Sequence, residues 1–184
     1  MGPLIVLALR LIGPLFIFRW PFWAGLVSMV VLDGCDVVMV DLFGYDHNGA
    51  IGAFYEAHYH QLDKVLDSYY LTLELLVSLR WDERIAKVTS IWLYIWRMVG
   101  VVLFELTQLR PILFFAPNMF ENFFLFIAAT RKWWPNWRVQ NVKRLAVVLF
   151  LLYIPKLPQE YILHVKQMQP WVLFKSTFLK GILP

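Results

Sequence analysis

Residues 23–40 read WAGLVSMVVLDGCDVVMV, an apolar run that contains the first aspartate pair, Asp33 and Asp36. A second apolar run, residues 62–79, begins with another pair, Asp63 and Asp67. The spacings of three and four residues place both carboxylates of each pair on one helix face. Inserting a carboxylate near a bilayer core costs about 2.5–3.5 kcal/mol, so two such pairs indicate a functional site. Because four converging carboxylates repel one another, we expect one or two divalent cations, Mg²⁺ or Mn²⁺, to hold them.

The composition favours an integral membrane protein. Of the 184 residues, 60% are hydrophobic and 16% are charged, whereas a soluble domain is nearer half apolar and a quarter charged. We therefore expect the chain to reside in an inner or cell membrane or in an endomembrane. The alternative is a soluble protein with an unusually apolar core, but several apolar runs approach the ~20 residues that a spanning helix needs.

The predicted fold class is all-α, with six transmembrane helices separated by Pro, Gly and charge clusters. Pro155 and Pro158 are expected to end the sixth segment. We predict one transmembrane domain over residues 1–158, followed by a C-terminal tail, 159–184, that lies in the membrane interface. The six segments are Pro3–Phe18, Phe22–Val40, Leu62–Leu79, Ile85–Leu106, Pro111–Thr130 and Val142–Ile154.

Aromatic and basic residues gather near the predicted segment ends, the pattern of side chains at a membrane–water interface. The net charge of +4 is modest, and the basic residues lie mostly in short loops. This suits contact with anionic lipid headgroups, and we expect no nucleic-acid partner. The single cysteine, Cys35, excludes an internal disulfide.

The two aspartate pairs resemble a known family signature. The segments Asp33-Gly34-Cys35-Asp36 and Asp63-Lys64-Val65-Leu66-Asp67 are similar to the motif D-x-x-D-G-x-x-A-R, eight residues, G-x-x-x-D-x-x-x-D of the CDP-alcohol phosphatidyltransferases. The stretch Leu9–Phe16 resembles the first helix of that family. The resemblance implies a six-helix membrane enzyme whose first pair ends helix two and whose second pair opens helix three.

The resemblance also implies roles for individual residues. Asp33, Asp36 and Asp63 would hold the metals, and Asp67, beside them, would be the general base that takes a proton from an acceptor alcohol. Arg97, inside the fourth segment, lies where related enzymes often carry an arginine and could contact a substrate phosphate. The expected substrates are a CDP-linked or lipid-linked phosphate, and membrane lipids are expected partners.

The chain departs from the signature in the half that approaches the nucleotide. The family glycine after the second aspartate is Val37, its Ala-Arg pair is Val40-Asp41, and its glycine before the third aspartate is Tyr59. These differences motivate an alternative, a non-catalytic member of the same fold that serves as a structural subunit of a larger membrane complex. The expected protein partners are a second copy of the chain, in a homodimer, or the subunits of a larger membrane complex. A third alternative is a small cation transporter or channel, although no internal repeat is visible.

Further polar residues leave their roles open. In the polar stretch 41–61, His58 and His60 could bind a metal together on a strand, or the stretch could be a solvated loop. Charged residues within apolar segments usually pair with an opposite charge or bind a ligand. Arg97 could pair with Glu74 or Glu105 instead of binding a phosphate. Pro117 to Asn122 predicts a kink or a broken helix in the fifth segment. The other charged residues in or near these segments are Arg10 and Glu121.

Overall fold

The computed structural model describes residues 2–33, 35, 38–40, 43, 50–109 and 111–162, apart from the side chains at positions 50, 51, 52, 56 and 60. Over these residues the chain is helical and contains no strand, which confirms the all-α prediction. The elements are α1 (Gly2–Ile12), the 3-10 helix η1 (Gly13–Phe18), α2 (Pro21–Val27), the π-helix η2 (Ser28–Asp33), α4 (Ala50–Ser78), α5 (Arg84–Thr107), α6 (Pro111–Phe115), α7 (Met119–Trp133) and α8 (Val142–Glu160).

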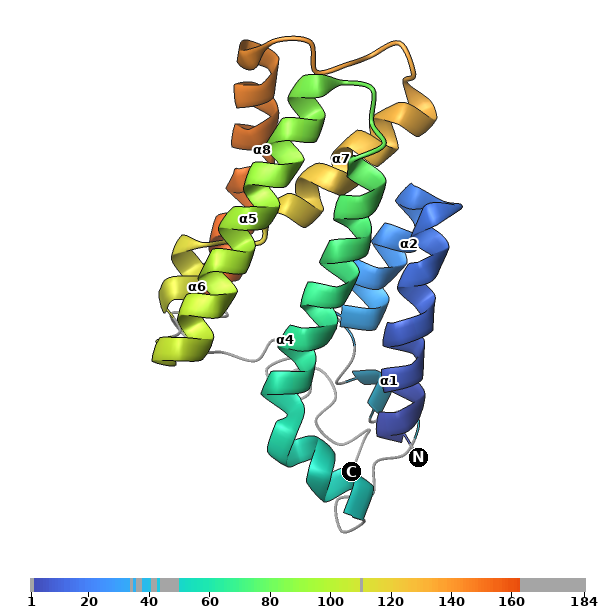
Figure 1. Ribbon diagram of the computed structural model, residues 1–184, viewed down its shortest axis with the longest axis vertical. Helices are drawn as coiled ribbons and strands as arrows, with labels where there is room; N and C mark the ends of the chain where they lie inside the picture. The colour runs from blue at the N-terminus through green and yellow to red at the C-terminus, as the bar shows by residue number, and fades with distance from the viewer. Residues whose placement is uncertain are drawn as a thin grey trace, which may run out of the picture.

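The helices form an elongated bundle (Figure 1), in which α1, α4 and α5 run roughly along the long axis and α7 crosses it obliquely. Two described segments are long and apolar enough to cross a membrane, α5 and the combined stretch Pro111–Trp133. The segments Gly2–Phe18 and Pro21–Asp33 are apolar but shorter. Two of the six predicted spanning segments therefore meet both the length and the composition criteria.

Two predicted boundaries are wrong. Residues 50–61 were expected in a polar connection but form the first turns of α4, where Phe54 stacks on His58 and Tyr55 contacts Tyr59. Both contacts join residues four apart, which stabilises a helix. The sixth segment does not end at its prolines, because α8 continues through Pro155 and Pro158 to Glu160.

The predicted interruption of the fifth segment is confirmed, since α6 ends at Phe115 and α7 begins at Met119. The Asn118 side chain caps α7 by accepting a hydrogen bond from the backbone N–H of Glu121. Glu121 in the first turn and basic residues in the last turn both suit the helix dipole. The sequence therefore specifies a new helix start after Pro117.

The core lies around α7, nine of whose fifteen residues are buried. Phe120, Phe123 and Phe124 are fully enclosed, and Phe124 stacks on Trp81 with 5.6 Å between ring centroids. Packing against α2, α4, α5 and α8 encloses α7 and fixes the relative positions of those helices.

Helix α5 is the opposite case, because its inward stripe consists of Ala86, Ser90, Arg97 and Gly100. Small residues permit close helix approach, and a Cβ on Gly100 would collide with the Cβ of Ala116. Much of the rest of α5 is apolar and exposed; Trp92, for example, is 67% exposed.

Candidate metal centre

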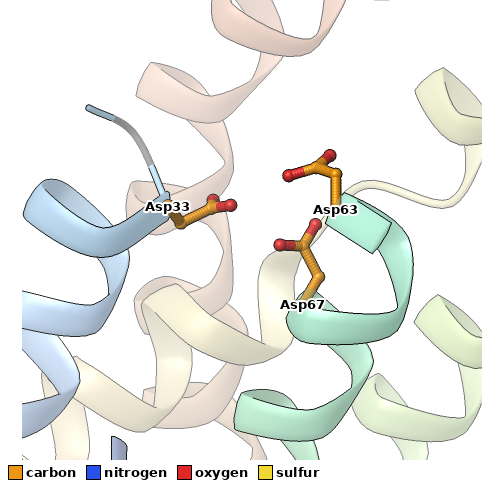
Figure 2. Close-up of side chains that lie close together, drawn as sticks. All are labelled: Asp33, Asp63 and Asp67. Carbon is orange, nitrogen blue, oxygen red and sulfur yellow. The ribbon is translucent and has the colours of Figure 1, made fainter. Parts of the chain in front are cut away.

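Three of the four predicted aspartates converge in space. Asp33 is the last residue of η2, and Asp63 and Asp67 lie one turn apart in the middle of α4. Figure 2 shows the three carboxylates pointing toward a common space between the two helices. One oxygen from each lies within 4.8 Å of the others. Asp36 lies outside the described residues. We refer to Asp33, Asp63 and Asp67 as the acidic triad.

Arg10 of α1 joins all three members of the acidic triad. Its Nη2 donates to Oδ1 of Asp33 at 2.9 Å and to Oδ1 of Asp67 at 2.8 Å, while its Nη1 donates to Oδ1 of Asp63 at 3.0 Å. The Arg10 side chain is only 4% exposed. A planar guanidinium with several donors suits such multiple carboxylate contacts, which a single ammonium group could not reproduce.

A second cation, Lys64, lies beside the acidic triad. Its Nζ is 3.0 Å from Oδ2 of Asp63 and 3.7 Å from Oδ2 of Asp67. Three carboxylates against two cations leave a formal charge of −1 among these five groups. The two cations therefore compensate most of the formal charge of the three carboxylates.

The donor set of the acidic triad fits a hard divalent cation. Mg²⁺ binds oxygens octahedrally at about 2.1 Å, so adjacent ligands lie about 3.0 Å apart and opposite ligands about 4.2 Å apart. The triad oxygens lie within 4.8 Å of one another, and side-chain movements would bring them to those spacings. Each Oδ1 already accepts from Arg10, so an ion bound to these three atoms would have to share them with the guanidinium or displace it. The triad could hold one ion on these terms.

Arg97 does not form the ion pairs considered from the sequence. Its Nη1 donates to the backbone carbonyl of Ala116 at 3.0 Å, and no carboxylate lies within ion-pair distance in the described part of the chain. Glu105 is exposed, and Glu74 is fully buried without a hydrogen-bond partner in that part. Arg97 interacts electrostatically with Lys64, which places it on the same side of the bundle as the acidic triad. Its contact with a substrate phosphate stays a prediction.

The histidine prediction is not supported in the form expected. His58 lies on a helix rather than a strand, so residues two apart point in different directions. The ring of His58 stacks on Phe54, and its Nδ1 lies 3.0 Å from the Phe54 carbonyl oxygen. The His60 side chain and the residues 41, 46 and 47 lie outside the described part of the structure.

A second polar cluster was not predicted as a unit. Glu160 of α8 accepts from the backbone N–H of Asn118 at 3.2 Å and pairs with Lys156 at 3.5 Å, and the Asn118 amide donates to Glu121 at 2.9 Å. The sequence signal was present, since Lys156 and Glu160 are four residues apart, but the expected helix end at Pro155 concealed it. This cluster connects the start of α7 to the end of α8.

Comparison of the chain with protein-family models, with curated proteins and with solved structures finds no match.

Proposed function

We propose that the chain is a metal-dependent membrane transferase of a phosphate-linked alcohol or lipid, with a fold like that of the CDP-alcohol phosphatidyltransferases. The observation that carries this proposal is the convergence of Asp33 of η2 with Asp63 and Asp67 of α4, although Asp33 and Asp63 are 30 residues apart in the sequence. Protein sites that bind phosphate through metal ions commonly use such carboxylates as the metal ligands.

The membrane location rests on the exposure of α5. A core helix of a soluble protein would be mostly buried, whereas only 17% of the most apolar window of α5 is buried. Large side chains such as Trp92, Trp96 and Leu106 extend outward, and apolar surface of this extent marks contact with lipid or protein. In this proposal six membrane segments are formed by α1–η1, α2–η2, α4, α5, α6–α7 and α8.

The proposed chemistry is displacement at phosphorus, in which positioning and charge neutralisation do most of the work. A bound divalent cation would neutralise and polarise the phosphoryl oxygens. Asp33 and Asp63 would hold it together with Asp36, while Asp67 would accept the proton of the acceptor hydroxyl. Arg10 keeps the carboxylates together, and Lys64 and Arg97 supply positive charge toward a substrate phosphate.

The test is divalent-cation binding by the detergent-purified chain, followed as a shift in melting temperature. We expect Mg²⁺ or Mn²⁺ to stabilise the wild type and to lose this effect in Asp33→Asn/Asp63→Asn. Asp82→Asn, an exposed carboxylate outside the acidic triad, is the matched control and should respond like the wild type. Product formation from CDP-linked lipids that is abolished by Asp67→Asn would then establish the transferase.

One observation favours a second candidate, a non-catalytic structural subunit of a larger membrane complex. The Arg10 guanidinium already provides the triad with a counter-charge, so the carboxylates do not require a metal to coexist. This suits a protein that has the fold of the family but no catalytic activity. The altered half of the signature, at Val37, Val40, Asp41 and Tyr59, suits the same interpretation. Absence of a cation shift in wild type and variant alike would favour this candidate.

A further inference from the structure

A basic cavity of about 450 Å³ lies where the ends of α4 and α7 meet the turn between η1 and α2. Four cations line it, Arg19, Arg80, Arg131 and Lys132, among aromatic rings. Arg131 lies 5.2 Å from the ring centroid of the buried Trp81. Aromatic faces hold such cations in place without neutralising them.

Most of this positive charge lacks a carboxylate partner. Glu83 lies 3.3 Å from Arg131 and 3.5 Å from Arg138. In the described part of the chain, no carboxylate lies within 4.0 Å of Arg19, Arg80 or Lys132, and all three residues are exposed. Like charges that converge around a hollow raise the local concentration of anions. The basic cavity therefore has the electrostatic character of an anion site.

An apolar groove continues from the basic cavity. It has a volume of about 440 Å³ and lies between α2, α7 and α8, and Phe22 lines both hollows. Along α7 the groove occupies residues 122–129 and the basic cavity residues 128–132, so that one follows the other. Seven of its ten lining residues are apolar, for example Leu125 and Leu152, and the polar ones are Asn122, Lys156 and Gln159. The basic cavity thus adjoins an apolar groove, an arrangement that matches a ligand with an anionic head and an apolar tail.

We propose that these two hollows bind one anionic glycerophospholipid, with its phosphate in the basic cavity and an acyl chain along the groove. Guanidinium groups match phosphate through paired hydrogen bonds, and the apolar lining buries the hydrocarbon. The basic cavity lies at the last turn of α7 and beside the turn that precedes α5, so it is near one end of both candidate spans. Trp20 and Trp23 line it, as expected at headgroup level.

This lipid site is separate from the acidic triad and does not depend on the proposed transferase. Asp67 and Ser78, the last residue of α4, are eleven residues apart, about 16 Å along the helix, and Arg80 lies beyond that end. A lipid here would contact a different end of the bundle from the triad. It would be a structural lipid, not the substrate of the proposed reaction.

The test is native mass spectrometry of the detergent-purified full chain, titrated with phosphatidylglycerol, phosphatidylcholine or inorganic phosphate. We expect phosphatidylglycerol to bind at least about tenfold more tightly than phosphatidylcholine, because each nearby cation favours the anionic headgroup. Arg19→Gln/Arg80→Gln/Lys132→Gln should remove that preference. Ala129→Trp, which fills the groove, should weaken phosphatidylglycerol binding and leave inorganic phosphate unaffected.

The controls change the same residue types outside both hollows. Arg84→Gln/Lys143→Gln removes two exposed cations, and Ala146→Trp adds an indole on the exposed side of α8; neither should alter lipid binding. If the triple variant melts below its control, the three single variants replace it, and each must weaken binding at least about twofold. Equal binding of both lipids, unchanged binding by the cation variants, or inorganic phosphate binding as tightly as the lipid would overturn the proposal.

Discussion

Arg10 contacts three carboxylates through Nη1 and Nη2 while only 4% of its side chain is exposed. Removing the cation from a buried ionic cluster leaves uncompensated charges, which costs about 3–5 kcal/mol. We expect Arg10→Gln to lower the free energy of unfolding by that amount in the absence of divalent cations. Thermal unfolding in detergent measures the change, with the exposed Arg84→Gln as its control.

The same variant distinguishes two sources of positive charge for the acidic triad, the Arg10 guanidinium and a bound divalent cation. With Arg10 gone, Mn²⁺ would be free to bind all three Oδ1 atoms, so the cation-dependent rise in melting temperature should be larger in Arg10→Gln than in the wild type. Arg10→Lys should remain destabilised, because one ammonium group cannot bridge three carboxylates. An Arg10→Gln protein as stable as the wild type without metal would contradict the role given to Arg10.

Glu74 makes a different residue-level prediction. Both carboxyl oxygens are buried and lack a hydrogen-bond partner in the described part of the chain, and Oε1 would lie 3.2 Å from a Cβ on Gly25. An unsatisfied buried polar group costs about 1–3 kcal/mol. Glu74→Met, which has a similar size, should therefore raise the free energy of unfolding by about that amount.

The control for this prediction is Glu105→Met on the exposed side of α5, which should change stability by no more than about 0.5 kcal/mol. A loss of stability in Glu74→Met would mean that the carboxyl has a stabilising partner. The sequence showed that Glu74 lies in an apolar segment, but only the packing of α2 and α7 around it shows that it is enclosed.

At the scale of elements, α5 depends on its small inward residues. A Cβ on Gly100 would overlap Ala116, whose carbonyl also accepts from Arg97. Gly100→Leu must therefore push α5 away from the α6–α7 break, and overpacking of this kind costs about 1–3 kcal/mol or more. Melting temperature should fall, whereas Val102→Leu, at a position 56% exposed, should behave as the wild type.

The sequence predicted the bounds of a helix well where the length of an apolar run sets them, and poorly where contacts between individual side chains set them. The bounds expected for α5, Ile85–Leu106, are within one residue at each end. The start of α4 was missed because Gly52 and the polar residues near it indicated a loop, whereas aromatic pairs four apart support a helix. The Lys156–Glu160 pair likewise spans Pro158 and connects α8 to α7.

At the scale of the whole molecule, the aspartate spacing predicted which side chains would share a helix face, and the resemblance predicted that the two pairs would meet. Asp33, Asp63 and Asp67 do meet. The contribution of Arg10 required the tertiary fold, because no spacing rule relates a residue on α1 to carboxylates 23, 53 and 57 positions away. Single charges inside apolar segments were thus recognised without their partners.

The exposed apolar surface of α5 yields a prediction about the environment of the whole molecule. Ile95 lies near the middle of α5 and is 43% exposed. If lipid surrounds α5, Ile95→Arg places a charge near the bilayer centre, which costs about 2.5–3.5 kcal/mol on insertion scales. We therefore expect less full-length protein in membranes after an alkaline carbonate wash, with Ile95→Leu as the matched control.

A soluble protein responds in the opposite way to the same substitution. On a water-exposed surface, an arginine in place of isoleucine changes stability by no more than about 0.5 kcal/mol and improves solubility. Wild-type chain released by the carbonate wash, together with an Ile95→Arg variant of undiminished yield, would contradict a membrane location. Retention of the wild type and loss of the variant would indicate that α5 contacts lipid. Ile95 is exposed, so an arginine at this position would be tolerated if water surrounded the helix.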